Sequence, residues 1–145
     1  MAGSSTTVTY DDGVDGSGLR GSIRRLLIDF TTDDTTGSVA CTTRKIVGRL
    51  IKIVTDPGSA APSANWDVVL TDEEGIDLSI HMDDVAIAAL IARHTTNSEE
   101  TYLPLEDTAG TGRVGAFPVV CDKLTVTVNN AGNSKTGQII LYYEI

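Results

Sequence analysis

Residues 110–115, GTGRVG, are the first place in the sequence where chemistry could be expected. They match the G-x-G-x-x-G pattern that binds the pyrophosphate of a dinucleotide. The pattern works only where a strand enters the loop and a helix leaves it, because the pyrophosphate binds at the helix N-terminus. The preceding LEDTA does not resemble a strand, and the following AFPVV contains Pro118 and is typical of an extended segment. We therefore interpret GTGRVG as a loop and expect no cofactor.

Two acidic segments suggest cation binding. DDGVDGSG (residues 11–18) resembles a calcium loop, but a loop that begins at Asp11 has Gly13 at its third position and Ser22 at its twelfth, so two carboxylate ligands are missing. LTDEEGID (residues 70–77) is rich in carboxylates, but its glycine and the flanking strands favour a solvated tight turn. We predict turns and no metal site. The acidic residues of the second segment are Asp72, Glu73, Glu74 and Asp77.

The remaining reactive side chains do not form a recognisable catalytic set. His81 and His94 are the only histidines, and no HExxH, CxxC or G-x-S-x-G pattern accompanies them. Cys41 and Cys121, the only cysteines, are interpreted as small buried hydrophobic residues. The single tryptophan, Trp66, is expected in the core. We therefore expect a protein that is not an enzyme.

Short runs of alternating apolar and polar residues recur along the chain, and a period of two is typical of half-buried antiparallel strands. Clusters of Gly, Pro, Asp or Asn separate the runs and favour turns. Regularly spaced runs of this kind predict an all-β fold, an antiparallel β-sandwich resembling a jelly roll, with about eight strands. The runs are residues 6–10, 23–31, 38–43, 46–55, 65–71, 100–105, 117–123, 123–130 and 136–145.

The last two runs predict a β-hairpin over residues 124–145. Leu124, Val126 and Val128 fall on one face of the first run, and the second run alternates in the same way. The intervening NNAGNSKTG is rich in Asn and Gly, which tolerate positive φ and allow the chain to reverse.

One segment has a different period. In HMDDVAIAALIARH (residues 81–94) the apolar residues fall near helical spacing, with acidic residues at the start and basic residues at the end, as a helix dipole favours. We predict one short helix near residues 82–93. The chain length of 145 residues is typical of one domain, so we expect a single domain over 1–145, with an N-terminal arm at 1–18 that can be extended.

The charge of the chain is strongly acidic and uneven. The net charge is −9, which disfavours nucleic-acid binding because phosphate contacts need Lys and Arg. Seven of the eleven basic residues precede residue 53, so residues 1–52 carry a net +1 and the remainder a net −10. These halves are either two differently solvated faces or a basic segment that docks onto an acidic partner. There is no basic and apolar leader and no apolar run of about 18 residues, so we expect assembly in the cytoplasm and no membrane.

Three stretches, taken together, resemble a family of small virion structural proteins of tailed bacteriophages, some of which are similar to capsid cement or decoration proteins. The shared features are a PG turn before NWDVVLTD, then HTTNSE, then AGNSKTG and a closing strand. About two thirds of the chain is covered, and the first 45 residues are not. The stretches are IVTDPGSAAPSANWDVVLTDEEGIDL (53–78), RHTTNSEETYLPL (93–105) and KLTVTVNNAGNSKTGQIILYYE (123–144).

The resemblance implies a protein on the outer capsid surface of the virion that bridges capsomers and stabilises the assembled head. Its implied partners are the major capsid protein and further copies of the chain in a dimer or trimer, with no nucleic acid and no membrane. Candidate shell contacts are Arg20, Arg24 and Arg25 and the segment TTVTYDDGVDG (6–16). Ordinary solvation of a strand face is the alternative reading of these arginines.

Two other functions remain open. The chain could be another virion component, such as part of the tail or a head fibre, which is present in few copies. It could also be a carbohydrate-binding or receptor-binding β-sandwich module, which needs exposed aromatic residues along a groove. The sequence holds one Trp, four Tyr and two Phe.

Overall fold

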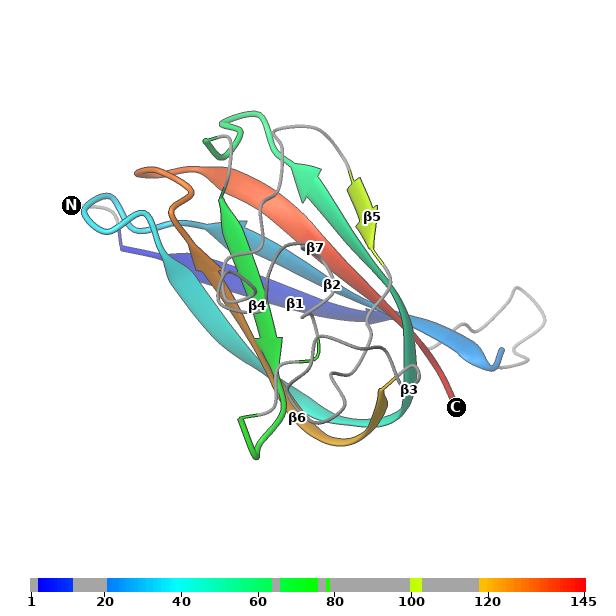
Figure 1. The fold of residues 1–145 in the computed structure, drawn as a ribbon. Helices are drawn as coiled ribbons and strands as arrows, with labels where there is room; N and C mark the ends of the chain where they lie inside the picture. Colours follow the sequence, from blue (N-terminus) through cyan, green and yellow to red (C-terminus); the bar gives the residue numbers. More distant parts are fainter. Residues whose placement is uncertain (1–2, 12–20, 64–65, 76–77, 79–99, 103–117) are drawn as a thin grey trace, which may run out of the picture.

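The computed structural model describes residues 3–11, 21–63, 66–75, 78, 100–102 and 118–145. These residues form seven strands of one antiparallel sheet and contain no helix (Figure 1). The all-β, antiparallel part of the prediction is therefore confirmed. The strands are β1 (Ser5–Asp11), β2 (Ile23–Thr31), β3 (Val39–Pro57), β4 (Asp67–Thr71), β5 (Glu100–Tyr102), β6 (Val119–Asn129) and β7 (Thr136–Glu144).

The described residues hold seven strands where about eight were expected for the chain, and two pairs of predicted runs join. Residues 38–43 and 46–55 belong to β3, and the runs on either side of residue 123 belong to β6. No Pro or Asn interrupts either junction, so the backbone continues as strand. The predicted helix near residues 82–93 and the GTGRVG loop lie outside the described residues. Within those residues, no helix is long and apolar enough to cross a membrane.

The order of strands along the sheet is β1-β2-β7-β3-β6-β4, and β5 pairs with β3 beside this path. Consequently β6 and β7 are not neighbours, and the hairpin predicted over residues 124–145 is wrong. Both strands lie against β3, on its opposite edges. In the loop between them, Ala131 forms backbone hydrogen bonds with two other loops. It accepts from the N–H of Ser63 at 2.8 Å and donates to the carbonyl of Gly37 at 3.2 Å.

The long strand β3 changes partners along its length. Its first half, from Val39 to Arg49, pairs with β6, and its second half, from Arg49 to Pro57, pairs with β7. Register shifts occur between Thr42 and Lys45 and between Leu50 and Lys52. Such bulges bend a strand and increase its twist. In Figure 1, β3 is correspondingly curved, and β4 crosses β1 and β2 in this view.

The inner faces of strands at both ends of the strand order, β2 at one end and β4 and β6 at the other, share one hydrophobic core. The rings of Phe30 on β2 and Trp66 just before β4 lie 5.6 Å apart between centroids, although β2 and β4 are far apart in the strand order. Trp66 is completely buried, as predicted. Burial of each such side chain contributes about 1.5–3 kcal/mol. Other core residues are Leu26, Ile28, Leu50, Ile53, Val68, Leu70, Leu124, Val126, Val128, Ile139, Leu141 and Tyr143.

The cysteines occupy different environments. Both are free thiols; Cys41 is half-buried, and burial raises the pKa of its thiol. Cys121 is exposed, so its predicted place in the core is wrong. Cys121 lies on the outer face of β6, opposite the exposed Val47 of β3. Val120 and Leu124, which point to the other face of β6, are buried.

Candidate functional site

The arginines proposed as shell contacts do not form one surface. Arg20 lies outside the described residues, whereas Arg24 and Arg25 are adjacent on β2 and therefore project from opposite faces. Arg24 is on the same face of β2 as the buried Leu26, and its Nε is buried without a hydrogen-bond partner among the described residues. Arg25 lies on the outer face.

Arg25 is engaged within the chain. Its Nε and Nη2 donate to the Asp11 carboxylate at 3.0 and 2.8 Å. The hydrogen bond to Asp11, and then one to Tyr142, raises the pKa of Arg25. An exposed ion pair of this kind contributes about 0–1 kcal/mol to stability. The Arg25 side chain therefore connects β2 to β1 through an ion pair and is not available as an unpaired cation for a partner protein.

A different surface lies at the bend of β3, where the ends of several strands meet. The register places Ile23 of β2 opposite Glu144 of β7, Glu144 opposite Arg49 of β3, and Arg49 opposite Val119 of β6. This row crosses four strands. We call the outward-facing side chains around it the bend surface: Ile23, Lys45, Val47, Arg49, Val119, Cys121, Lys123 and Glu144.

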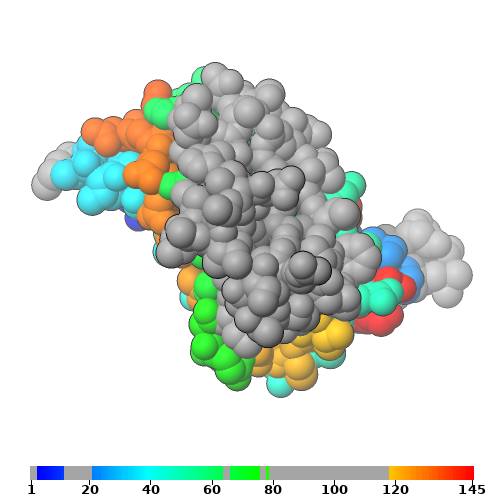
Figure 2. Space-filling view, in the orientation of Figure 1, coloured from blue at the N-terminus to red at the C-terminus, as the bar shows by residue number. Residues whose placement is uncertain are grey.

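The bend surface gathers exposed apolar side chains. Four large hydrophobic residues are exposed in the described part of the chain: Val119 at 81%, Val47 at 56%, Ile145 at 56% and Ile23 at 44%. Three of them belong to the bend surface, and Ile145 directly follows its Glu144. In Figure 2 the end of β7 (red), the start of β2 (blue) and the middle of β3 (teal) meet at the right-hand side of the molecule. Clusters of exposed apolar residues rimmed by polar ones mark interaction sites.

The bend surface is also basic. Arg49 donates from Nη2 to Oε2 of Glu144 at 3.0 Å, so this pair is neutral. Lys45 and Lys123 are exposed and lie directly opposite one another on β3 and β6. The surface thus carries two uncompensated positive charges on a chain of net charge −9.

An acidic cluster lies on the other side of β6. Oxygen atoms of Asp72, Glu74 and Asp122 all fall within 4.8 Å of one another. A hydrogen bond between the side chains of Glu74 and Asp122 raises the pKa of Glu74. The backbone N–H of Gly75 donates to the carbonyl of Asp72 at 3.2 Å, so the tight turn predicted here is confirmed. Three carboxylates could bind a hard cation such as Ca²⁺, which needs six to eight oxygen ligands.

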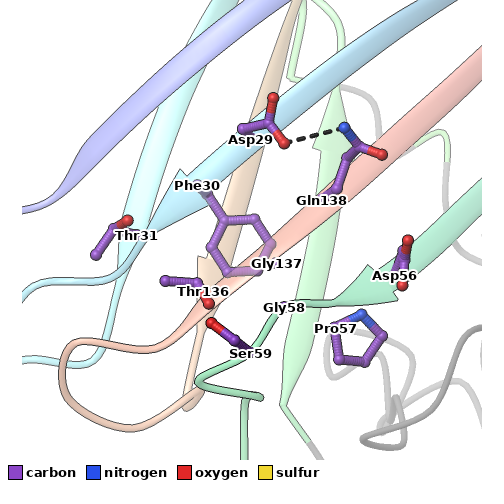
Figure 3. A pocket seen from close by; sticks show the side chains of 10 residues that line it. All are labelled: Asp29, Phe30, Thr31, Asp56, Pro57, Gly58, Ser59, Thr136, Gly137 and Gln138. Atoms are coloured by element: carbon purple, nitrogen blue, oxygen red, sulfur yellow. Dashed lines mark hydrogen bonds between the residues drawn. The ribbon is translucent and has the colours of Figure 1, made fainter.

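An open pocket of about 490 Å³ lies at the opposite end of the sheet from the bend (Figure 3). Asp29, Gln138 and Asp56 form a row across β2, β7 and β3, and Nε2 of Gln138 donates to Oδ1 of Asp29 at 2.9 Å. These groups could bind hydroxyl-rich ligands. The only aromatic residue of the lining, Phe30, is 3% exposed and offers little stacking surface. The other lining residues are Thr31, Pro57, Gly58, Ser59, Thr136 and Gly137.

The sequence interpretation missed the bend surface. Val47 and Val119 lie in runs that were expected to contribute to a core. Extending the alternation of Leu124, Val126 and Val128 backward assigns the odd-numbered residues of β6 to the outer face, and this signal identifies Val119 and Lys123. The pairing of Lys123 with Lys45 has no such local signal. No protein-family model matches the sequence, and no curated protein matches it.

Proposed function

We propose that this chain is a phage capsid cement protein that binds the outer surface of the assembled head through the bend surface and bridges capsomers. It acts as one domain over residues 1–145, without catalysis or cofactor. In this proposal the bent sheet is a jelly-roll-like sandwich, with β3 passing from one layer to the other. The major capsid protein is the partner, with further copies of the chain in a dimer or trimer, and neither nucleic acid nor membrane takes part.

The observation that carries the proposal is the exposure of Val119, Val47 and Ile23 on one face of the sheet, with Val47 and Val119 on the neighbouring strands β3 and β6 and Ile23 at the other end of the row. Residues in paired strands lose little conformational freedom on binding, so apolar contact area there converts efficiently into affinity. Burial of these three side chains would contribute several kcal/mol at roughly 25 cal/mol per Å².

Stabilisation of a head follows from mass action. A protein that binds only the assembled shell lowers the free energy of that state by its binding free energy, repeated at every occupied site. A dimer or trimer engages several capsomers at once and gains from effective concentration. A negative charge of −9 brings no penalty on the outer surface, where the chain need not contact packaged DNA.

The test uses heads of the tailed phage whose genome encodes the chain, produced without it. Purified protein is added, the heads are sedimented, and bound copies are counted against the major capsid protein. We expect saturation at many copies per head and release of DNA at a higher temperature. Absence of co-sedimentation would refute the proposal. Saturation at a few copies would instead identify a tail or fibre component.

Serine substitutions test the surface itself. We expect Val47→Ser with Val119→Ser to weaken head binding by roughly 30-fold, because about 2 kcal/mol of apolar burial is lost. Ala40→Ser, an exposed position on the first half of β3, is the matched control and should bind normally. Equal binding by all proteins would exclude the bend surface as the contact.

A carbohydrate-binding or receptor-binding module is the alternative, and the pocket beside Asp29 and Asp56 would then be its site. A glycan array distinguishes the two functions. Saturable binding that is lost on Asp56→Asn and kept in the Val47→Ser, Val119→Ser protein would favour the module.

A further inference from the structure

We infer that the bend surface recognises an acidic segment of its protein partner, with Lys45 and Lys123 together receiving carboxylates beside an apolar contact. This inference rests on the proposed function, because it specifies the chemistry of the capsid residues that the bend surface would meet.

The first argument is the unfavourable placement of the two lysines within the chain. Lys45 and Lys123 are cross-strand partners on the same face of β3 and β6. Side chains in directly opposed positions lie about 5 Å apart at Cβ, and like charges at that spacing are destabilising. A folded chain gains nothing from this pair, whereas a bound carboxylate between the two ammonium groups would convert repulsion into attraction.

The second argument is that the neighbouring rows of β3 and β6 supply no carboxylate on this face. The adjacent rows on the outer face are Thr42 with Thr125 and Val47 with Cys121. Asp122 is the only acidic residue of β6, and it projects to the other face, where it lies with Asp72 and Glu74.

Three other cations of the sheet are engaged by contacts within the chain. Arg25 pairs with Asp11 at 2.8 Å and Arg49 with Glu144 at 3.0 Å, and the ammonium of Lys52 lies 4.2 Å from the centre of the Tyr142 ring. No ion pair or aromatic contact of Lys45 or Lys123 is present among the residues that the structure describes.

The occupant that fits this surface is a different protein. A two-fold dimer through the bend surface would bring four lysines together, since the same patch meets itself. A nucleic acid or an anionic bilayer would meet the negative field of a chain with charge −9, and two lysines are too few to offset it. A protein segment with carboxylates beside apolar side chains complements both the charge and the apolar area.

The test measures binding to the same heads as a function of salt and charge. Wild-type affinity should fall as ionic strength rises, because exposed charges are screened. Lys45→Glu and Lys123→Glu should each weaken binding by about tenfold, and Lys45→Arg with Lys123→Arg should keep it. Lys135→Glu, which makes the same change in net charge in the loop before β7, is the matched control and should bind like wild type.

The outcomes separate this inference from the proposed function. If the serine variants of Val47 and Val119 bind weakly while both Lys→Glu proteins bind as wild type at every salt concentration, the surface is correct and the acidic partner is wrong. If Lys135→Glu weakens binding as much as Lys45→Glu, only net charge matters and the inference is also wrong. If wild type does not bind heads, both proposals fall. Self-association that the Lys→Glu changes strengthen would assign the surface to a second copy and overturn the inference.

Discussion

Gly48 is the residue on which the bend of β3 most directly depends. Its φ of +148° is rarely adopted by residues with a side chain. A Cβ atom at this position would overlap the carbonyl oxygen of Glu144 and lie 3.1 Å from its carbonyl carbon and 3.4 Å from Cγ2 of Ile145. The backbone of Glu144 cannot move away easily, because β7 is hydrogen-bonded between β2 and β3. Only glycine fits this crossing.

The expected loss of stability for Gly48→Ala combines two effects. The unfavourable φ costs about 1–2 kcal/mol, and forcing a methyl group against fixed backbone costs about 1–3 kcal/mol. We therefore expect destabilisation of about 3 kcal/mol, a large part of the roughly 5–15 kcal/mol typical of a domain. With about 2.1 cal/mol/K of unfolding entropy per residue over 145 residues, this corresponds to a decrease in Tm of roughly 10 °C.

Urea unfolding followed by Trp66 fluorescence measures this loss, since Trp66 is fully buried and becomes exposed on unfolding. Gly75→Ala is the matched control. Gly75 has a φ of +81°, but no atom lies within 4 Å of the position that a Cβ would take, so this variant reports the conformational cost alone, about 1 kcal/mol. If Gly48→Ala is no more destabilising than Gly75→Ala, the close approach of β3 to Glu144 is not a constraint, and our account of the bend is refuted.

Three further substitutions test local features. Thr55→Val should stabilise by about 1 kcal/mol in urea unfolding, because Oγ1 of Thr55 is buried with no hydrogen-bond partner in the described structure; a loss of stability would contradict this. Glu74→Gln should be more stable than wild type at pH 7 and equal to it near pH 3. Folding raises the pKa of Glu74 beside Asp122, so the wild-type penalty appears as pH rises through that pKa. Asp33→Ala should be less stable at pH 6, with a gap that closes on acidification, because hydrogen bonds, above all from the backbone N–H of Thr36, lower the pKa of Asp33; a gap independent of pH would exclude this linkage.

The sequence alone was sufficient for the local architecture. Alternation over residues 23–31 predicted β2 with its observed bounds, and the pattern of residues 136–145 predicted β7. The burial of Trp66 and the turn at Gly75 also followed from residue types. These features depend on contacts between near neighbours and on the two-residue period of a strand, both of which are visible in a single sequence.

Tertiary structure decided which strands pair and therefore what the outer face displays. The Asn-rich and Gly-rich loop before β7 suggested a hairpin, but β6 and β7 pair with opposite edges of β3, and Ala131 in the loop is hydrogen-bonded to two loops that are distant in the sequence. The register of β3 with β6 brings Lys45 opposite Lys123 and Val47 opposite Cys121. Strand periodicity indicates which face a residue shares with its own neighbours, whereas cross-strand partners are chosen by packing of the whole core. The surface that we propose as functional is a product of that packing.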